Sequence, residues 1–180
     1  IKRRIVGAGA ADDLSGIDLA LPNSRFMERI IGAEYPAVSS SVVYPPITTE
    51  FGRERWFKGV SRILSVGTSE EKGIEIIEGL ANRYPEKKFL VAGVASSSCV
   101  GPRPLNISFL GWISRLQNEI DGADLILVPS QWDEPFGRIA VEAIRRRRIV
   151  LVANRGGLPE AVNRRPELIV EGDVDAWRQR

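Results

Sequence analysis

The sequence of 180 residues contains no histidine and only one cysteine, Cys99, to which we assign no role. The usual zinc sites, haem ligation, Ser-His-Asp triads and Cys-His dyads need these side chains, so their scarcity excludes those sites. The sequence also lacks any apolar run near the roughly 20 residues that a membrane-spanning helix requires. Any chemistry must therefore use carboxylates, arginine, lysine, hydroxyl groups or backbone dipoles, and we expect no metal and no cofactor.

Neither positive nor negative charge is in large excess, because the sequence has 25 Lys and Arg and 23 Asp and Glu, for a net charge of +2. This balance gives no electrostatic case for nucleic acid as a partner.

One free cysteine suits a reducing compartment, so we expect a soluble, cytoplasmic protein. A hydrophobic content of 43% is enough for one globular domain with a full core. Because the chain starts with isoleucine, we expect it to be a piece of a longer protein.

Short β-branched runs alternate with segments of helical spacing, which predicts an α/β fold, a Rossmann-like parallel sheet of about six strands with helices on both faces. Apolar residues recur at helical spacing over 74–84, and Pro85 ends that helix. The other expected helices cover 24–33 (with Asn23 or Ser24 as N-cap), 114–122, 137–147 and 157–163. The expected strands cover 17–21, 42–44, 63–66, 89–92, 107–110, 125–128, 149–152 and 168–170.

Residues 1–45 are interpreted as a connector and residues 46–180 as the main domain. The connector is loop-like near its start, and the sequence Tyr44-Pro45-Pro46 breaks the chain at its end. Gly7 and Gly9 could begin a dinucleotide-binding fingerprint. However, aspartate replaces the third glycine and no clear strand precedes the pair, which argues against that interpretation.

The most informative stretch follows the expected strand at 125–128 and enters a helix near residue 137. Ligands of open parallel sheets bind beyond the carboxyl ends of the strands, where this loop lies. The amides of residues 136–139 lack intrahelical acceptors and suit a phosphate group. Glu134 and Glu142 flank this expected pocket, and their spacing suits hydrogen bonds to a sugar on one side of a diphosphate and a ribose on the other. Alternatively, both carboxylates are ordinary helix-start and solvated charges.

The stretch from Glu134 to Glu142 resembles the E-x7-E motif of retaining GT-B glycosyltransferases, in particular family GT4 (glycosyltransferase group 1). The motif alone is a weak pattern, but further landmarks of that family occur in its order from about residue 17 to the end. They are Asn23-Ser24-Arg25-Phe26, Val43-Tyr44-Pro45-Pro46-Ile47, Val66-Gly67, Glu71-Lys72-Gly73-Ile74, Phe109-Leu110-Gly111, Ala123-Asp124, Pro129-Ser130 and Gly156-Gly157-Leu158-Pro159-Glu160.

The resemblance implies that the chain is the C-terminal, donor-binding half of a two-domain GT-B enzyme, preceded by a remnant of the N-terminal domain. Such enzymes move a hexose-type unit from a nucleoside diphosphate sugar, such as a UDP- or GDP-sugar, to an acceptor hydroxyl with retention of anomeric configuration. The acceptor would bind mainly to the missing N-terminal domain, so we expect the isolated chain to be inactive in transfer. GT-B enzymes need no bound metal, in agreement with the absence of histidine here.

The resemblance also implies roles for particular residues. Lys72 and Glu134 would be catalytic, because the lysine neutralises the leaving diphosphate and the glutamate contacts the hydroxyls of the donor sugar. Glu142 would bind the ribose hydroxyls. For Lys72 the alternative is a solvated lysine at a helix start. The other implied donor-binding residues are Gly67, Thr68, Trp112, Ile113, Phe136, Gly137, Arg138 and Ile139, with backbone groups near Trp112 and Ile113 lining the base pocket.

Two positions depart from the family pattern. Thr68 stands where the family usually has an arginine that binds the diphosphate, which leaves open a non-catalytic nucleotide-sugar-binding module. The run Arg145–Arg148 replaces a Gly-x-Pro turn, and Arg147 takes the position of the glycine. We interpret the run as a solvated helix end. The alternative is an anion-binding or peripheral membrane surface, at the inner face of a membrane, because many family members act on lipid-linked acceptors.

Overall fold

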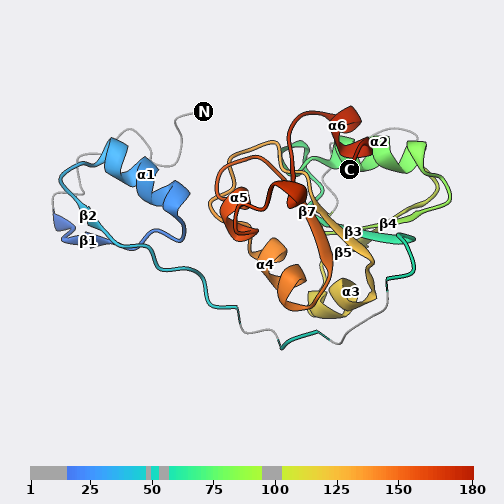
Figure 1. Cartoon of the computed structure of the whole chain (residues 1–180), viewed down its shortest axis with the longest axis horizontal. Coiled ribbons are helices and arrows are strands. Elements are labelled where there is room, and N and C mark those ends of the chain that lie inside the picture. The colour runs from blue at the N-terminus through green and yellow to red at the C-terminus, as the bar shows by residue number, and fades with distance from the viewer. Residues whose placement is uncertain (1–15, 48–49, 53–56, 95–102) are drawn as a thin grey trace. The chain divides into compact units, whose positions relative to one another are not determined.

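The computed structural model describes residues 16–47, 50–52, 57–94 and 103–180. Contacts divide the chain into two compact units, Ile1–Tyr44 and Pro45–Arg180 (Figure 1). The loop-like start of the chain around Gly7 and the single cysteine, Cys99, lie outside the described residues. None of the described helices has the length and apolar character of a membrane span.

In the described part of the first unit, residues 16–44, the helix α1 (Arg25–Glu34) lies between two short parallel strands, β1 (Leu19–Ala20) and β2 (Ser39–Ser40). The Ser24 side chain caps the helix by accepting a hydrogen bond from the Met27 amide at 3.1 Å, as the sequence predicts. Its identity as the remnant of another domain stays a prediction.

The prediction of a strand over 42–44 is wrong. The strand that pairs with β1 lies earlier in the chain, since Leu19 pairs with Ser39 and Ala20 with Ser40. Two further bonds follow, from the Ser41 amide to the carbonyl oxygen of Ala20 at 3.1 Å and from the Val43 amide to that of Pro22 at 2.9 Å. Pro22 has no amide hydrogen to donate in return, so the ladder does not continue to residues 42–44.

The second unit is built on a six-stranded sheet in which all neighbouring strands are parallel, in agreement with the predicted α/β fold. The strands lie in the order β5-β4-β3-β6-β7-β8. Their bounds are β3 (Arg62–Val66), β4 (Lys88–Ala92), β5 (Ile107–Gly111), β6 (Leu125–Val128), β7 (Ile149–Ala153) and β8 (Ile169–Val170). The chain leaves β3 toward β4 and β5 and then returns to β6 on the other side of β3. The strand order therefore reverses between β3 and β6, and the carboxyl ends of the strands at such a switch point are where ligands of these sheets bind.

Helices cover the sheet because its central strands are apolar on both sides. The fully buried residues of these strands include Leu64, Val91, Ile126 and Val152. The helices of this unit are α2 (Ile74–Arg83), α3 (Leu116–Gly122), α4 (Arg138–Arg145), α5 (Leu158–Ala161) and α6 (Val174–Arg178), with the 3-10 turns η2 (Glu70–Lys72) and η3 (Pro166–Leu168).

Helix α6, which the sequence analysis did not predict, lies beside α2 (Figure 1). Asp173 caps it by accepting hydrogen bonds from the amides at 175 and 176, and Trp177 is 96% buried in the core. A helix of five residues is too short to be stable alone, so this burial holds it in place.

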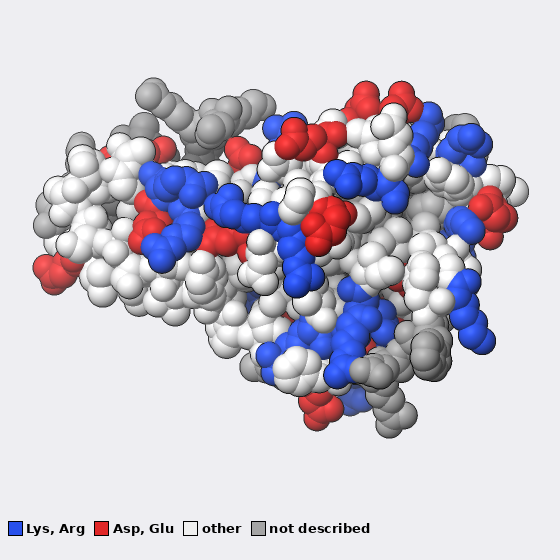
Figure 2. Space-filling view, in the orientation of Figure 1, with Lys and Arg blue, Asp and Glu red and all other residues white. Residues whose placement is uncertain are grey.

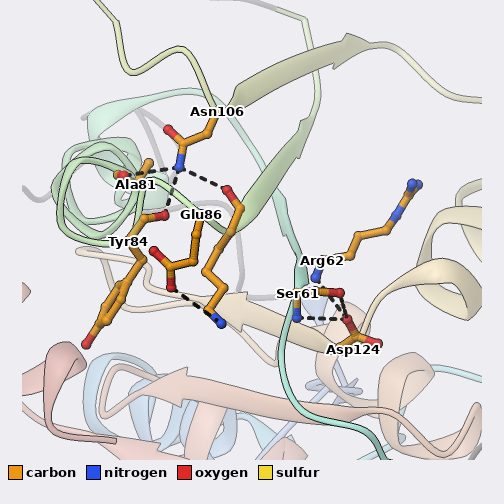
Figure 3. A network of polar contacts seen from close by, with 8 residues as sticks. Ser61, Arg62, Ala81, Tyr84, Glu86, Asn106 and Asp124 are labelled. Atoms are coloured by element: carbon orange, nitrogen blue, oxygen red, sulfur yellow. Dashed lines mark hydrogen bonds and ion pairs between the residues drawn. The ribbon is translucent and has the colours of Figure 1, made fainter.

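Two polar side chains secure the amino-terminal edge of the sheet (Figure 3). Asp124, just before β6, accepts hydrogen bonds from the amides of Ser61 and Arg62 at 3.0 and 2.9 Å, which ties β6 to β3. Asn106, just before β5, donates from Nδ2 to three carbonyl oxygens where α2 leads into β4, those of Ala81, Tyr84 and Lys87. Both anchors lie opposite the carboxyl edge, which leaves the loops of that edge to form the site.

Candidate functional site

The loops that follow β3 and β6 bring Lys72 and Glu134 together at the switch point of the sheet. Lys72 Nζ lies 2.5 Å from Glu134 Oε1, although 62 positions separate the two residues in the sequence. The side chain of Glu134 is 12% exposed and that of Lys72 is 34% exposed. Lys72 is thus not an isolated, solvated lysine, and the ion pair is partly shielded from water.

Ser130 completes this cluster and was missed as a functional residue by the sequence analysis. The side chain is fully buried, and its hydroxyl donates to Glu134 Oε1 at 2.7 Å. Both donors use the same carboxylate oxygen, and among the described residues Oε2 has no recorded partner. The signal in the sequence was a serine two residues after a buried strand and four residues before the glutamate.

Close contacts between the two loops hold Lys72 in position. Gly73 has a φ of +77°, and a Cβ there would overlap the carbonyl oxygen of Pro129, so only glycine fits. The Gln131 amide donates to the carbonyl oxygen of Glu71 at 2.8 Å. Lys72 Nζ also lies 5.1 Å from the centroid of the Trp132 ring.

The residues directly after β3 support the lysine rather than add a second cation. Gly67 has a φ of +105°, and a Cβ there would lie 2.5 Å from Lys72 Cγ, so the stem of the lysine passes over this glycine. Thr68 is 94% buried, and its hydroxyl donates to the carbonyl oxygen of Val94 at 2.5 Å.

The start of α4 presents backbone donors beside this cluster. Gly137 precedes the helix with a φ of +93°, and a Cβ there would overlap Leu158. Within the described part of the chain, no hydrogen-bond acceptor is recorded for the amides of residues 137–139. The preceding Phe136 is buried in the core, which anchors the turn. Such a helix start favours an anionic group.

Glu142 lies just over one turn into α4, as expected from the motif. Its side chain is 13% exposed, and Oε1 lies 3.5 Å from a guanidinium nitrogen of Arg138. Because Glu142 is mostly buried, the alternative that it is a solvated helix residue is wrong. That Glu134 is an ordinary charge at a helix start stays the alternative for that residue. Among the described residues, no three carboxylates or cysteines converge as a metal site would require.

The loop after β7 closes on the backbone of the Glu134 loop. The Gly156 amide donates to Asp133 Oδ1 at 3.1 Å, and the Gly157 amide donates to the carbonyl oxygen of Glu134 at 2.7 Å. A Cβ on either glycine would overlap backbone atoms of residues 133–136. The landmark at 156–160 therefore has a packing role.

Trp112 and Ile113 follow β5, and β4 separates that strand from β3. The Trp112 side chain is 76% exposed. These two residues thus lie at the same carboxyl edge of the sheet as Lys72, but after β5, which is the second strand from β3. Their role in a base pocket stays a prediction.

The arginine run is not simply a solvated helix end, which corrects that interpretation. Arg146 is 14% exposed in its side chain and forms two hydrogen bonds to the Asp121 carboxylate. These bonds hold the pKa of Asp121 below its ordinary value. Arg148 donates to the carbonyl oxygen of Asp121, and the Arg145 guanidinium lies 4.5 Å from the centroid of the Phe51 ring.

The chain matches a known protein family and two curated proteins over part of its length. A family model described as "Glycosyl transferases group 1" matches residues 47–180. A curated Klebsiella pneumoniae protein, an uncharacterised 42.6 kDa protein in the cps region, is 32% identical over 108 residues, 58% of this chain and 29% of that protein. Glycogen synthase from Elusimicrobium minutum is 26% identical over 102 residues, 51% of this chain and 21% of the enzyme. The chain thus spans less than a third of either relative.

Solved structures share its fold at low sequence identity. A glycosyltransferase from Rickettsia africae superposes with a TM-score of 0.73 at 18% identity, covering 97% of this chain and 56% of that chain. HepE from Anabaena, solved in complex with UDP and glucose, superposes with a TM-score of 0.64 at 19% identity, covering 79% of this chain and 46% of that one. The family model and the α/β sheet that these glycosyltransferases share lead to one conclusion: the chain belongs to the group 1 glycosyltransferases and has the Rossmann-like fold of a GT-B domain.

Proposed function

We propose that this chain is the nucleoside diphosphate sugar-binding half of a retaining glycosyltransferase of family GT4. The observation that carries the proposal is the convergence of Lys72 and Glu134, 2.5 Å apart, at the switch point of the sheet and beside the start of α4. A cation, a carboxylate and helix-start amides are the groups that a sugar diphosphate requires.

Lys72 and the amides at 137–139 would bind the diphosphate of the donor. As the bond to the sugar breaks, negative charge grows on the leaving diphosphate, and fixed donors stabilise that charge. Each charge-assisted contact is worth about 1.5–3 kcal/mol. These groups would supply the charge neutralisation that other transferases obtain from a metal.

The two carboxylates would bind hydroxyl groups on either side of the diphosphate. Oε2 of Glu134 is available to accept from the donor sugar, since Lys72 and Ser130 share Oε1. Glu142 would accept from the ribose. The fold shared with HepE, which was solved with UDP and glucose, supports a UDP-sugar as the first donor to test, with GDP-sugars as the alternative.

The reaction we propose for the whole enzyme is transfer of a hexose to an acceptor hydroxyl with retention of configuration. The acceptor would bind mainly to residues beyond this chain, because the chain covers only about half of the solved glycosyltransferases it matches. We therefore expect donor binding, and no transfer, from the 180 residues alone.

Calorimetric titration of the chain with UDP, GDP and the corresponding glucose and mannose nucleotides tests this function. We expect selective binding of one base, weakened about tenfold or more by Glu142→Ala, because the ribose loses a charged acceptor. Lys72→Ala should weaken binding of the diphosphate at low salt. An absence of binding at millimolar nucleotide, or full affinity in both variants, would contradict the proposal.

A second candidate, a nucleotide-sugar-binding module without catalysis, is favoured by Thr68. Its buried hydroxyl donates to Val94 and adds no positive charge where the family usually places an arginine. Sugar release from the bound donor separates the candidates when measured in the longer natural protein. Slow hydrolysis or transfer that Lys72→Ala abolishes supports the enzyme, and tight binding without turnover supports the module.

A surface for membranes or nucleic acid has less support. The side chains of Arg146 and Arg148 are engaged with Asp121, and that of Arg145 with Phe51. On the face shown in Figure 2, Lys and Arg occur in separate groups interspersed with Asp and Glu. Neither feature provides the single strong basic surface that such partners need.

A further inference from the structure

Two side chains that would bind different parts of the donor bind each other in the structure. Lys72, proposed to hold the diphosphate, pairs with Glu134, proposed to hold the sugar. A diphosphate that approaches Lys72 must therefore compete with a carboxylate that already compensates the charge of the lysine. That carboxylate also repels the diphosphate directly, since both are anions.

The cost of this competition depends on what replaces the lysine at Glu134. The carboxylate is 12% exposed, so water reaches it poorly when the ammonium group turns toward another anion. Ser130 keeps one hydrogen bond to Oε1, but a neutral hydroxyl does not replace a positive charge. A bare nucleoside diphosphate brings no donor for this carboxylate, whereas the hydroxyls of a sugar donate to it directly.

We infer that the Lys72–Glu134 pair makes the site select a nucleoside diphosphate sugar over the free nucleoside diphosphate. The inference rests on the proposed function and adds a property to the same site. Glu134 acts as an internal competitor for Lys72 until sugar hydroxyls satisfy it. Loss of the sugar in the reaction restores the competition, and this weakens the hold on the nucleoside diphosphate that is left as product.

The test is to remove the charge of Glu134 while keeping its shape. In Glu134→Gln the competitor is neutral, so affinity for inorganic pyrophosphate and for UDP should rise about tenfold, the scale of one charged hydrogen bond. Affinity for UDP-glucose should rise less or fall, because its hydroxyls lose a charged acceptor. The ratio of UDP-glucose affinity to UDP affinity should therefore drop about tenfold or more. If GDP is the bound base, GDP and GDP-mannose replace these probes.

Two further variants distinguish the effect of the Lys72–Glu134 pair from the effect of removing any nearby negative charge. Glu71 adjoins Lys72 and is exposed, so Glu71→Gln removes one negative charge nearby without touching the pair. We expect Glu71→Gln to change pyrophosphate affinity less than twofold. In a Lys72→Met background, Glu134→Gln should no longer raise pyrophosphate affinity by more than the direct charge effect, about twofold. Circular dichroism establishes that each variant is folded.

The outcomes distinguish this inference from the proposed function. If the unmodified chain binds none of these ligands, both are overturned. If it binds UDP or GDP, but Glu134→Gln leaves pyrophosphate affinity and the sugar-to-diphosphate ratio unchanged, the function stands and selection by the pair is wrong. An equal gain from Glu71→Gln also overturns the inference, since bulk charge would then explain the effect.

Discussion

At the scale of single residues, the site depends on glycines that let backbone segments approach closely. Gly73 lies against Pro129, and Gly156 and Gly157 lie against the loop that carries Glu134. The family landmarks at these positions are thus explained by packing as well as by ligand chemistry. The contacts bring three loops from different strands into one arrangement.

Gly156→Ala should be strongly destabilising. The residue has a φ of +55°, and a Cβ would overlap the backbone of Glu134, so either the loop or the peptide must move. We expect a loss of about 2–4 kcal/mol in the free energy of unfolding, together with weaker nucleotide binding. Urea unfolding measures the loss.

Gly122→Ala is the matched control for this substitution, because the nearest atom to its added Cβ lies at an ordinary 3.5 Å. It should change stability by less than about 1 kcal/mol. Equal effects from the two substitutions would mean that the overlap at Gly156 relaxes without cost.

At the scale of elements, the arginine run joins parts of the second unit that are distant in sequence. Arg146 at the end of α4 binds Asp121 in α3 and also donates to the carbonyl oxygen of Glu50 at 3.4 Å. The Gly52 amide donates to the carbonyl oxygen of Arg145. Arg147 ends the helix with a φ of +56°, the left-handed conformation expected at the position of the family's glycine.

The Asp121–Arg146 pair predicts a pH dependence of stability. Because the pKa of Asp121 is lowered by its hydrogen bonds to Arg146, the pair stabilises the folded state above the pKa of the unfolded chain. This contribution is lost as the pH falls through the lower, folded pKa, at values below about 4. With Asp121 37% exposed, the effect is about 1 kcal/mol or less.

Unfolding of the chain and of Asp121→Asn from pH 7 to pH 3 measures this contribution. The variant should be less stable at pH 7, and the difference should shrink as the pH falls. A constant difference over the whole range would show that the carboxylate charge of Asp121 is unimportant.

Prediction of elements from sequence succeeded where the periodic signal was strong and local. The apolar run at 125–128 became β6, and the helical spacing after Gly73 became α2. Prediction failed for α6, which is stabilised by burial of Trp177. It also failed for residues 42–44, which form no strand because the opposite segment contains Pro22. Both failures concern partners that are distant in sequence.

At the scale of the whole molecule, every residue of the proposed site belongs to the second unit, Pro45–Arg180. That unit contains the six-stranded sheet and the hydrophobic core. At about 136 residues it buries a large enough fraction of its surface to fold as an independent domain.

Residues 45–180 produced alone should therefore bind the preferred nucleotide with a dissociation constant within about twofold of that of the full chain. Calorimetric titration of both proteins, with circular dichroism as a control for folding, provides the comparison. A folded 45–180 protein that no longer binds would mean that the first unit contributes to the donor site.

The sequence by itself determined the fold class, the family resemblance, and the residue types available for chemistry, because these depend on composition, periodicity and ordered local motifs. It indicated Lys72, Glu134 and Glu142 through that resemblance. Only the tertiary structure decided that Lys72 and Glu134 pair, that Ser130 shares the same carboxylate oxygen, and that Arg146 is paired and mostly buried. The physical reason is that ion pairs and burial depend on which loops the strand order brings together, and strand order is a property of the assembled sheet.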